Sequence, residues 1–175
     1  MRVKQRLVAF SLTCLSACAH VTPAAAPSSA ALAPELSSLG FYVGHWACTG
    51  HELDERGNVT KDYPDLEVRV APAYDRWLTV DVYDHGAHVS SELKGVDGAN
   101  HFHHVWTAND GSYGSLTATG WTGSHMVFDE DHPAATDKTR MTFTKLDATH
   151  YTHRAETDTG HGYRLGFEKR CHKLA

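Results

Sequence analysis

The stretch Arg76-Trp77-Leu78-Thr79-Val80-Asp81-Val82-Tyr83-Asp84 has the residue pattern of a β-strand. Successive strand side chains point to opposite faces, and β-branched and aromatic residues are enriched in strands. The pattern therefore separates two faces, with Leu78, Val80 and Val82 on one and Trp77, Thr79, Asp81 and Tyr83 on the other. Asp84-His85-Gly86 is a turn signal that ends the run.

Similar runs recur along the rest of the chain at a spacing of about ten residues. They lie at roughly 42–52, 63–71, 87–95, 100–107, 113–119, 124–129, 139–145, 149–157 and 161–171. Turn signals such as Asn109-Asp110-Gly111 and Asp158-Thr159-Gly160 separate them. An all-β fold follows, either a sandwich or a barrel, and only closure removes both edge strands. We expect a ten-stranded antiparallel up-and-down barrel.

A short helix is predicted before the first strand, at Ala33-Pro34-Glu35-Leu36. Proline suits the first helical turn, and glutamate favours its positive end. Leu36 and Leu39 are three residues apart and can share one face, while Gly40 ends the helix. We expect this helix to close one end of the barrel.

The N-terminus has the organisation of an export signal. A basic start, Met1-Arg2-Val3-Lys4-Gln5-Arg6, precedes an apolar run from Leu7 to Leu15 that is too short to span a bilayer. Leu15-Ser16-Ala17-Cys18 resembles the lipobox of bacterial lipoproteins. The resemblance implies that residues 1–17 are a signal peptide and that Cys18 receives a diacylglycerol. The alternative is an ordinary secretory signal cut at Ala17-Cys18-Ala19 or Ala24-Ala25-Ala26.

Residues 18–34 are rich in Ala, Pro and Ser and contain no Asp, Glu, Lys or Arg, which predicts a flexible tether. Residues 35–175 then form one domain. The membrane is the expected partner through lipidated Cys18. Ala19 is not the aspartate that, in this lipoprotein class, favours retention at the inner membrane. The expected location is therefore the bacterial envelope, on the outer membrane facing the periplasm.

The charge balance argues against one class of partner. The chain has 16 Lys and Arg against 21 Asp and Glu, a net charge of −5, and no basic stripe. Nucleic acid is therefore not an expected partner.

The four cysteines divide into two pairs. Cys14 and Cys18 lie at the N-terminus, and Cys48 and Cys171 lie near the two ends of the domain. In an oxidising compartment the second pair predicts a disulfide, which is compatible with neighbouring first and last strands of a closed barrel. Two free, buried thiols are the alternative.

Three motifs, in this order and spacing, resemble the calycin-type barrels, which include lipocalins and nitrobindin-like proteins. A broad bacterial family of small secreted proteins of unknown function is more similar still. The motifs are Val43-Gly44-His45-Trp46, Gly120-Trp121-Thr122-Gly123 and Cys171-His172-Lys173. The resemblance implies that Trp46 packs at the closed end with Leu36, Leu39 and Phe41, and that any ligand lies in the open interior.

Aromatic and apolar residues of the predicted strands are candidates for lining that interior. They are Trp77, Tyr83, Phe102, Trp106, Met126, Phe128, Tyr163 and Phe167. A register slip of one residue would exchange the two faces of a strand. A small apolar or amphipathic ligand is the expected occupant.

Histidines offer a second chemistry. His101 and His103 share a strand face and can chelate a transition metal if His88 or His125 adds a ligand; solvated histidines are the alternative. Nitrobindin-like proteins hold haem through a histidine late in the barrel, where this chain has His150 and His153. The surrounding family stretch, His-Leu-x-Ala, is not recognisable here.

The sequence contains no recognisable nucleophile or phosphate-binding motif. The leading hypothesis is a membrane-anchored, non-catalytic lipoprotein that binds a small ligand inside its barrel. The alternatives are a metal- or haem-binding enzyme and a structural or interaction protein of the envelope.

Overall fold

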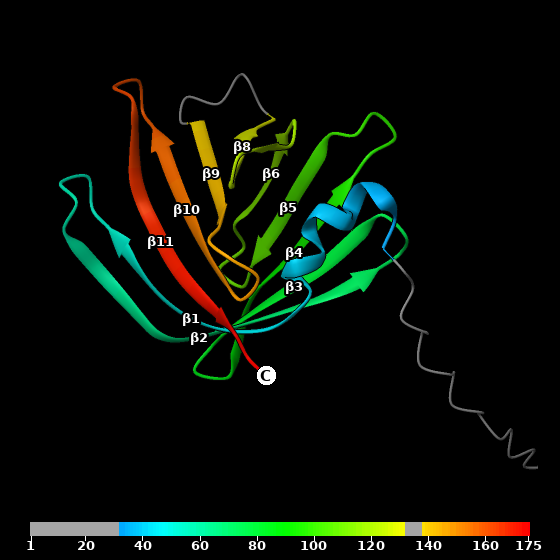
Figure 1. The fold of residues 1–175 in the computed structure, drawn as a ribbon. Coiled ribbons are helices and arrows are strands. Elements are labelled where there is room, and N and C mark those ends of the chain that lie inside the picture. Colours follow the sequence, from blue (N-terminus) through cyan, green and yellow to red (C-terminus); the bar gives the residue numbers. More distant parts are fainter. Residues whose placement is uncertain (1–31, 132–137) are drawn as a thin grey trace, which may run out of the picture.

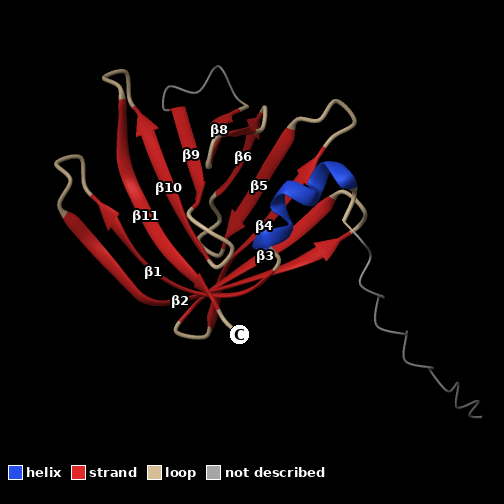
Figure 2. Ribbon diagram, in the orientation of Figure 1, coloured by secondary structure: helices blue, strands red, loops and turns tan. Residues whose placement is uncertain are grey.

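The computed structural model describes residues 32–131 and 138–175. The predicted signal peptide, the lipidation site Cys18 and most of the predicted tether lie outside these residues. Strands dominate the described chain, and η1 (Pro34–Tyr42), a 3-10 helix, is the helical element that Figure 2 shows. Within the same ranges, no helix has the length and apolar character needed to cross a bilayer.

The strands follow one another around a single antiparallel sheet. They are β1 (Gly44–Leu53), β2 (Val59–Ala73), β3 (Trp77–Asp84), β4 (Ala87–Val96), β5 (Phe102–Ala108), β6 (Tyr113–Ala118), β7 (Trp121–Thr122), β8 (His125–Glu130), β9 (Lys138–Lys145), β10 (His150–Asp158) and β11 (Tyr163–Lys173). Pairing between β1 and β11 and between β6 and β8 closes the sheet. Figure 1 shows the strands curling around a common interior, with η1 beside β4. The prediction of a closed ten-stranded barrel with one short helix is confirmed.

Several boundaries differ from the sequence prediction. Helix η1 continues past Gly40, its predicted end, to Tyr42, so β1 begins at Gly44 instead of 42. Strand β2 begins at Val59, four residues before the predicted start at 63, because Val59–Asp62 continue the ladder with β1 as far as Leu53. Strand β7 was not predicted. It consists of only Trp121 and Thr122, which pair with Met126 and His125 across a tight turn. Two residues are too few for a periodic signal.

The core lies at the end of the barrel that η1 covers. Leu36, Leu39 and Tyr42 of the helix are buried there, as is Trp46 of β1. The Trp46 Nε1–H donates to the Tyr42 carbonyl at 2.8 Å, and its ring meets Tyr151 edge-on at 4.9 Å. Phe41 packs between Trp121 and Phe143. The predicted structural role of Trp46 at a helix-plugged end is confirmed.

A disulfide joins the first and last strands of this core. Cys48 and Cys171 are direct partners in the β1–β11 register, with Cα atoms 4.1 Å apart. Both cysteines are buried. The predicted pairing is therefore present, and it locks the strand pair through which the chain closes on itself.

Candidate functional site

A cavity of about 600 Å³ lies inside the barrel, beside the core. Its walls reach Glu52 at the end of β1, Asp84 at the end of β3, and Asn109 and Asp110 in the β5–β6 turn. Asn109 and Asp110 are exposed, so the cavity meets the surface at this hairpin end. The volume lies within the range of small-molecule sites, about 300–1,000 Å³.

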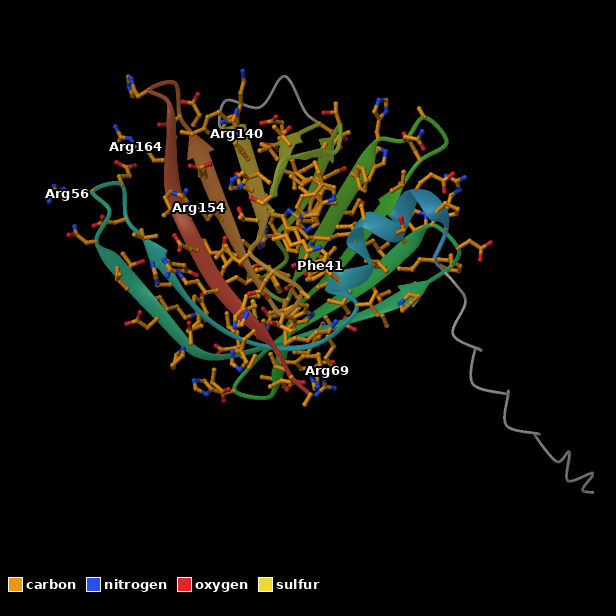
Figure 3. The ribbon with its side chains drawn as sticks, in the orientation of Figure 1. Phe41, Arg56, Arg69, Arg140, Arg154 and Arg164 are labelled. Carbon is orange, nitrogen blue, oxygen red and sulfur yellow. A yellow bond between two sulfur atoms is a disulfide. The ribbon has the colours of Figure 1, made fainter. Side chains whose placement is uncertain are left out.

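The hairpins at this end contact one another. The Arg164 Nη1 donates to the Glu55 carbonyl at 3.3 Å, linking the β10–β11 and β1–β2 hairpins. Figure 3 shows Arg164 and Arg56 on the same side of the molecule. In the described part of the chain, these hairpin turns lie at the end of the barrel where the cavity meets the surface.

Most of the wall is apolar. It is formed by Leu66, Val82, Val89, Trp106, Met141, Ala155 and Phe167. Trp106 depends on a glycine that sequence reasoning missed. Gly114 faces Trp106 in the β5–β6 register, and a Cβ at Gly114 would lie only 2.6 Å from the indole nitrogen. The missing side chain leaves the space that the indole occupies.

Buried polar and charged side chains form the deep part of the cavity and the layer beneath it. They are Glu92 and Lys94 on β4, His104 on β5, His153 on β10 and Lys169 on β11. We call these five residues the inner polar cluster. His104, His153 and Lys169 each lie two residues along their strand from a core residue, namely Phe102, Tyr151 and Cys171. The cluster therefore separates the core from the open part of the cavity.

Contacts tie one side of the cluster together. The Lys94 ammonium forms an ion pair with the Glu92 carboxylate. The same carboxylate oxygen lies 3.0 Å from His104 Nε2, which is 3.2 Å from the Lys94 Nζ. On the opposite side, His153 and Lys169 are register partners on β10 and β11. The rings of His104 and His153 lie 6.1 Å apart and connect the two sides.

Burial and mutual charge set the protonation states of the cluster. Burial and the Lys94 ammonium lower the pKa of His104 from its ordinary 6.5 to about 4. Burial, Lys169 and Lys94 hold the pKa of His153 well below its ordinary value. Burial alone would raise the pKa of Glu92, but Lys94, His104 and Lys169 together hold it well below its ordinary value. At neutral pH both imidazoles are neutral and Glu92 is ionised.

These shifts predict a protein that loses stability in mild acid. Between pH 6.5 and about 4 the unfolded chain protonates His104 while the folded protein does not, so stability falls as the pH decreases. A shift of this size corresponds to about 3 kcal/mol, and His153 acts in the same direction. Glu92 adds a further loss at lower pH, as its depressed folded pKa is approached.

Urea unfolding at pH 7 and pH 5 measures this loss. A His104→Phe variant should show a flatter pH dependence, whereas His161→Ala at an exposed turn should keep the wild-type slope. Equal slopes in wild type and His104→Phe would contradict the assignment.

The structure disperses the residues predicted to line the cavity. Trp106 and Phe167 lie on its wall. Phe102, Met126 and Phe128 lie in the buried core, and Phe128 packs edge-on against the His104 ring at 5.6 Å. The structure thus brings five of the eight residues into the barrel, two of them onto the cavity wall.

Trp77 and Tyr83 belong to the outer face, which corrects their predicted place in the interior. Trp77 faces Gly95 in the β3–β4 register, and a Cβ at Gly95 would lie 2.3 Å from its ring. Tyr83 packs under the Arg69 guanidinium, 4.4 Å from the ring centroid. The other face of β3 carries the buried Leu78, Val80 and Val82. Aromatic residues that cover the outer face of a strand alternate in the sequence in the same way as aromatic residues that line a cavity, so the alternation does not distinguish the two faces.

A strand irregularity corrects the place of Tyr163. Ala155 pairs with Phe167, but the next residue, Glu156, pairs with Leu165, so Gly166 is an extra residue in β11. This bulge reverses the alternation before Phe167. The Tyr163 ring instead packs against the Arg140 guanidinium, which lies 3.8 Å from the ring centroid. Arg140 precedes Met141 on β9, and Met141 lines the cavity from the opposite face of that strand.

The histidines predicted to bind a metal have another arrangement. His103 Nε2 lies 3.0 Å and His101 Nδ1 3.5 Å from the same oxygen of Asp97. His88 contacts Ser91 and Asp81, and His125 contacts Thr144, so neither joins them. Among residues 32–131 and 138–175 no group of three metal-ligating side chains has the geometry for an ion. His150 forms a hydrogen bond with the Asp147 carboxylate at an exposed turn.

The fold and the cavity define a small closed β-barrel whose interior opens to the surface at one end. Rv2717c from M. tuberculosis, known from a crystal structure, is similar, with 18% identity and a TM-score of 0.62 over 83% of this chain and all of that one. A second structure, EF1p2_mFAP2b bound to DFHBI, has 14% identity and a TM-score of 0.36 over 77% of this chain and 95% of that one. The first likeness supports the fold.

No protein-family model matches the chain, and no curated protein matches its sequence.

Proposed function

We propose that this protein is a lipid-anchored binding protein of the bacterial envelope that holds a small amphipathic molecule inside its barrel. One observation carries the proposal: a cavity of about 600 Å³ with an apolar wall and a polar inner end. Apolar walls with a few convergent polar groups are typical of small-molecule sites. The largely apolar wall supplies the contacts that such a binding role needs.

The interior is tested by filling it. Ala155 lies on the cavity wall of β10, and its neighbour Arg154 is exposed on the other face. We expect Ala155→Trp to displace the ligand, whereas Arg154→Trp adds the same ring outside. The Arg154–Glu168 pair that the control loses is exposed on the arginine side and contributes little.

Mature protein would be isolated from its own host with a lipid-solubilising copolymer instead of detergent, and its small molecules extracted for mass spectrometry. Subtracting the Ala155→Trp extract from the Arg154→Trp extract removes the background of membrane lipid. A species depleted only in the Ala155→Trp sample identifies the ligand. Identical extracts from wild type and both variants would contradict binding inside the barrel.

The membrane anchor is a separate part of the proposal. Its support is the basic start, the short apolar run and Leu15-Ser16-Ala17-Cys18. Wild-type protein should be found in the membrane fraction with a diacylglycerol on Cys18, and Cys18→Ala should lack the lipid. Ala19 favours the outer membrane facing the periplasm, which membrane fractionation tests. Unmodified wild-type protein, cut at Ala17-Cys18-Ala19 or Ala24-Ala25-Ala26, would support secretion without an anchor.

One observation favours haem as a second candidate ligand. His153 is on the cavity wall, is neutral at physiological pH, and has no hydrogen-bond partner among the described residues. A neutral imidazole is a suitable axial ligand, and bound haem would supply redox or gas-binding chemistry. A Soret band in protein from the native host, absent from a His153→Ala variant, would favour haem. A silent visible spectrum would favour the colourless ligand.

A further inference from the structure

The inner polar cluster contains more positive than negative charge. Glu92 is its only carboxylate, and it faces two ammonium groups, Lys94 and Lys169. Lys94 takes the direct ion pair with Glu92. Lys169 is only 4% exposed, yet no carboxylate among the described residues lies within 4 Å of its ammonium. One ammonium in the barrel therefore lacks a direct counter-ion.

The lysines and the carboxylate set the charge balance of the cluster. Two buried ammonium groups, Lys94 and Lys169, share one buried carboxylate, Glu92, which leaves an excess of one cationic group. Burial lowers the pKa of Lys169 from its ordinary value, while the nearby Glu92 carboxylate opposes this shift through space without contacting the ammonium. An incompletely paired charge in a barrel interior is unfavourable, and a bound anion would offset that penalty.

The position of the two lysines decides which of them a ligand can reach. Lys169 is on the cavity wall, next in that wall to Phe167 of the same strand. Lys94 does not line the cavity, and its ammonium lies 5.7 Å from the ring of Tyr42, the helix residue that plugs the core. Lys169, the lysine without a contacting carboxylate, is therefore the one of the two that a ligand in the cavity can reach.

We propose that the ligand carries a single anionic group, which pairs with Lys169 at the inner end of the cavity while its apolar part lies against the walls formed by Phe167, Met141 and Leu66. This inference rests on the proposed binding function and names the ligand class: amphipathic monoanions such as carboxylates or sulfonates. One negative charge balances the inner polar cluster, in which a second anion would have no further ammonium to pair with. Neutral amphiphiles would gain the wall contacts alone.

Two dyes with the same apolar body test the charge. Anilinonaphthalenesulfonate carries a sulfonate, and N-phenylnaphthylamine is the same ring system without it. Lys169→Met removes the charge while keeping the chain length close, and Lys169→Arg keeps the charge. Arg170→Met is the matched control, because it removes a positive charge from the next residue of β11, which is exposed on the outer face.

We expect Lys169→Met to weaken sulfonate dye binding about tenfold or more, the usual size of a charge-assisted hydrogen bond, and to leave the neutral dye within about twofold. Lys169→Arg should retain most of the sulfonate affinity, and Arg170→Met should change neither dye. Competition by dodecanoate but not dodecanol, lost in Lys169→Met, extends the result to carboxylates.

Equal weakening of both dyes by Lys169→Met would overturn the inference, because it would assign Lys169 a packing role. Unchanged sulfonate affinity would also overturn it, since an unprotonated amine shows no preference for anions. In either case saturable binding of the neutral dye keeps the proposed function. Failure of both dyes to bind wild type would overturn the binding function itself, and with it the inference.

Discussion

Replacing Glu92 by glutamine is expected to lower the free energy of unfolding by about 3–5 kcal/mol at neutral pH. The carboxylate is buried, pairs with Lys94 and contacts His104 Nε2 at 3.0 Å. Its removal leaves Lys94 and Lys169 as two buried cations without an anion. Deprotonation of one lysine can relieve part of this penalty, which limits the loss.

Urea unfolding of wild type and Glu92→Gln measures the effect. Glu55→Gln, at an exposed turn position, is the control and should change stability by no more than about 0.5 kcal/mol. Glu92→Gln combined with Lys94→Met should recover part of the loss, because the pair is then removed together. A loss below about 1 kcal/mol in the single variant would mean that the cluster does not hold its charges in the ionised state.

Removing the disulfide should have an effect of similar size. Cys48 and Cys171 are separated by 123 positions in the sequence, and closing a loop of this length stabilises a fold by about 4–5 kcal/mol in the chain-entropy model. Both cysteines lie in the core of the β1–β11 pair, so Cys48→Ala with Cys171→Ala also loses packing. We expect a total loss of about 5–6 kcal/mol.

Urea unfolding with and without reductant separates the two contributions. Reductant should lower the free energy of unfolding of the wild type only by the contribution of the cross-link, because both cysteine side chains remain. It should have no effect on the double alanine variant. A wild-type midpoint unaffected by full reduction of the bond would contradict this stabilising role. Loss of dye binding together with stability would show that closure of the β1–β11 seam also maintains the cavity.

Residues with one possible environment could be assigned from the sequence. Trp46 follows a helix whose Leu36 and Leu39 need a buried surface, and the structure buries all three. Cys48 and Cys171 were the two domain cysteines, and their strands are neighbours once the barrel closes. These predictions depend on local periodicity and on counting, which are properties of the chain.

Residues that depend on strand parity or on a distant partner could not be assigned. On β4 the buried residues are Glu92 and Lys94, while Leu93 between them is 39% exposed, the reverse of the usual pattern. The one sequence indication was that Glu92 and Lys94 alternate in step with Val96, an apolar residue at the end of the same strand that is buried. The partners that make the reversal tolerable, such as His104, come from other strands.

The sequence by itself determined the all-β class, the short plugging helix, the strand spacing and the cysteine pair, because each follows from residues within one element or from composition. Only the tertiary structure decided which face of β3 is inside, where the bulge at Gly166 reverses β11, and which charges meet across the barrel. Charged residues can be buried only where oppositely charged or polar groups converge, and that convergence exists only after closure.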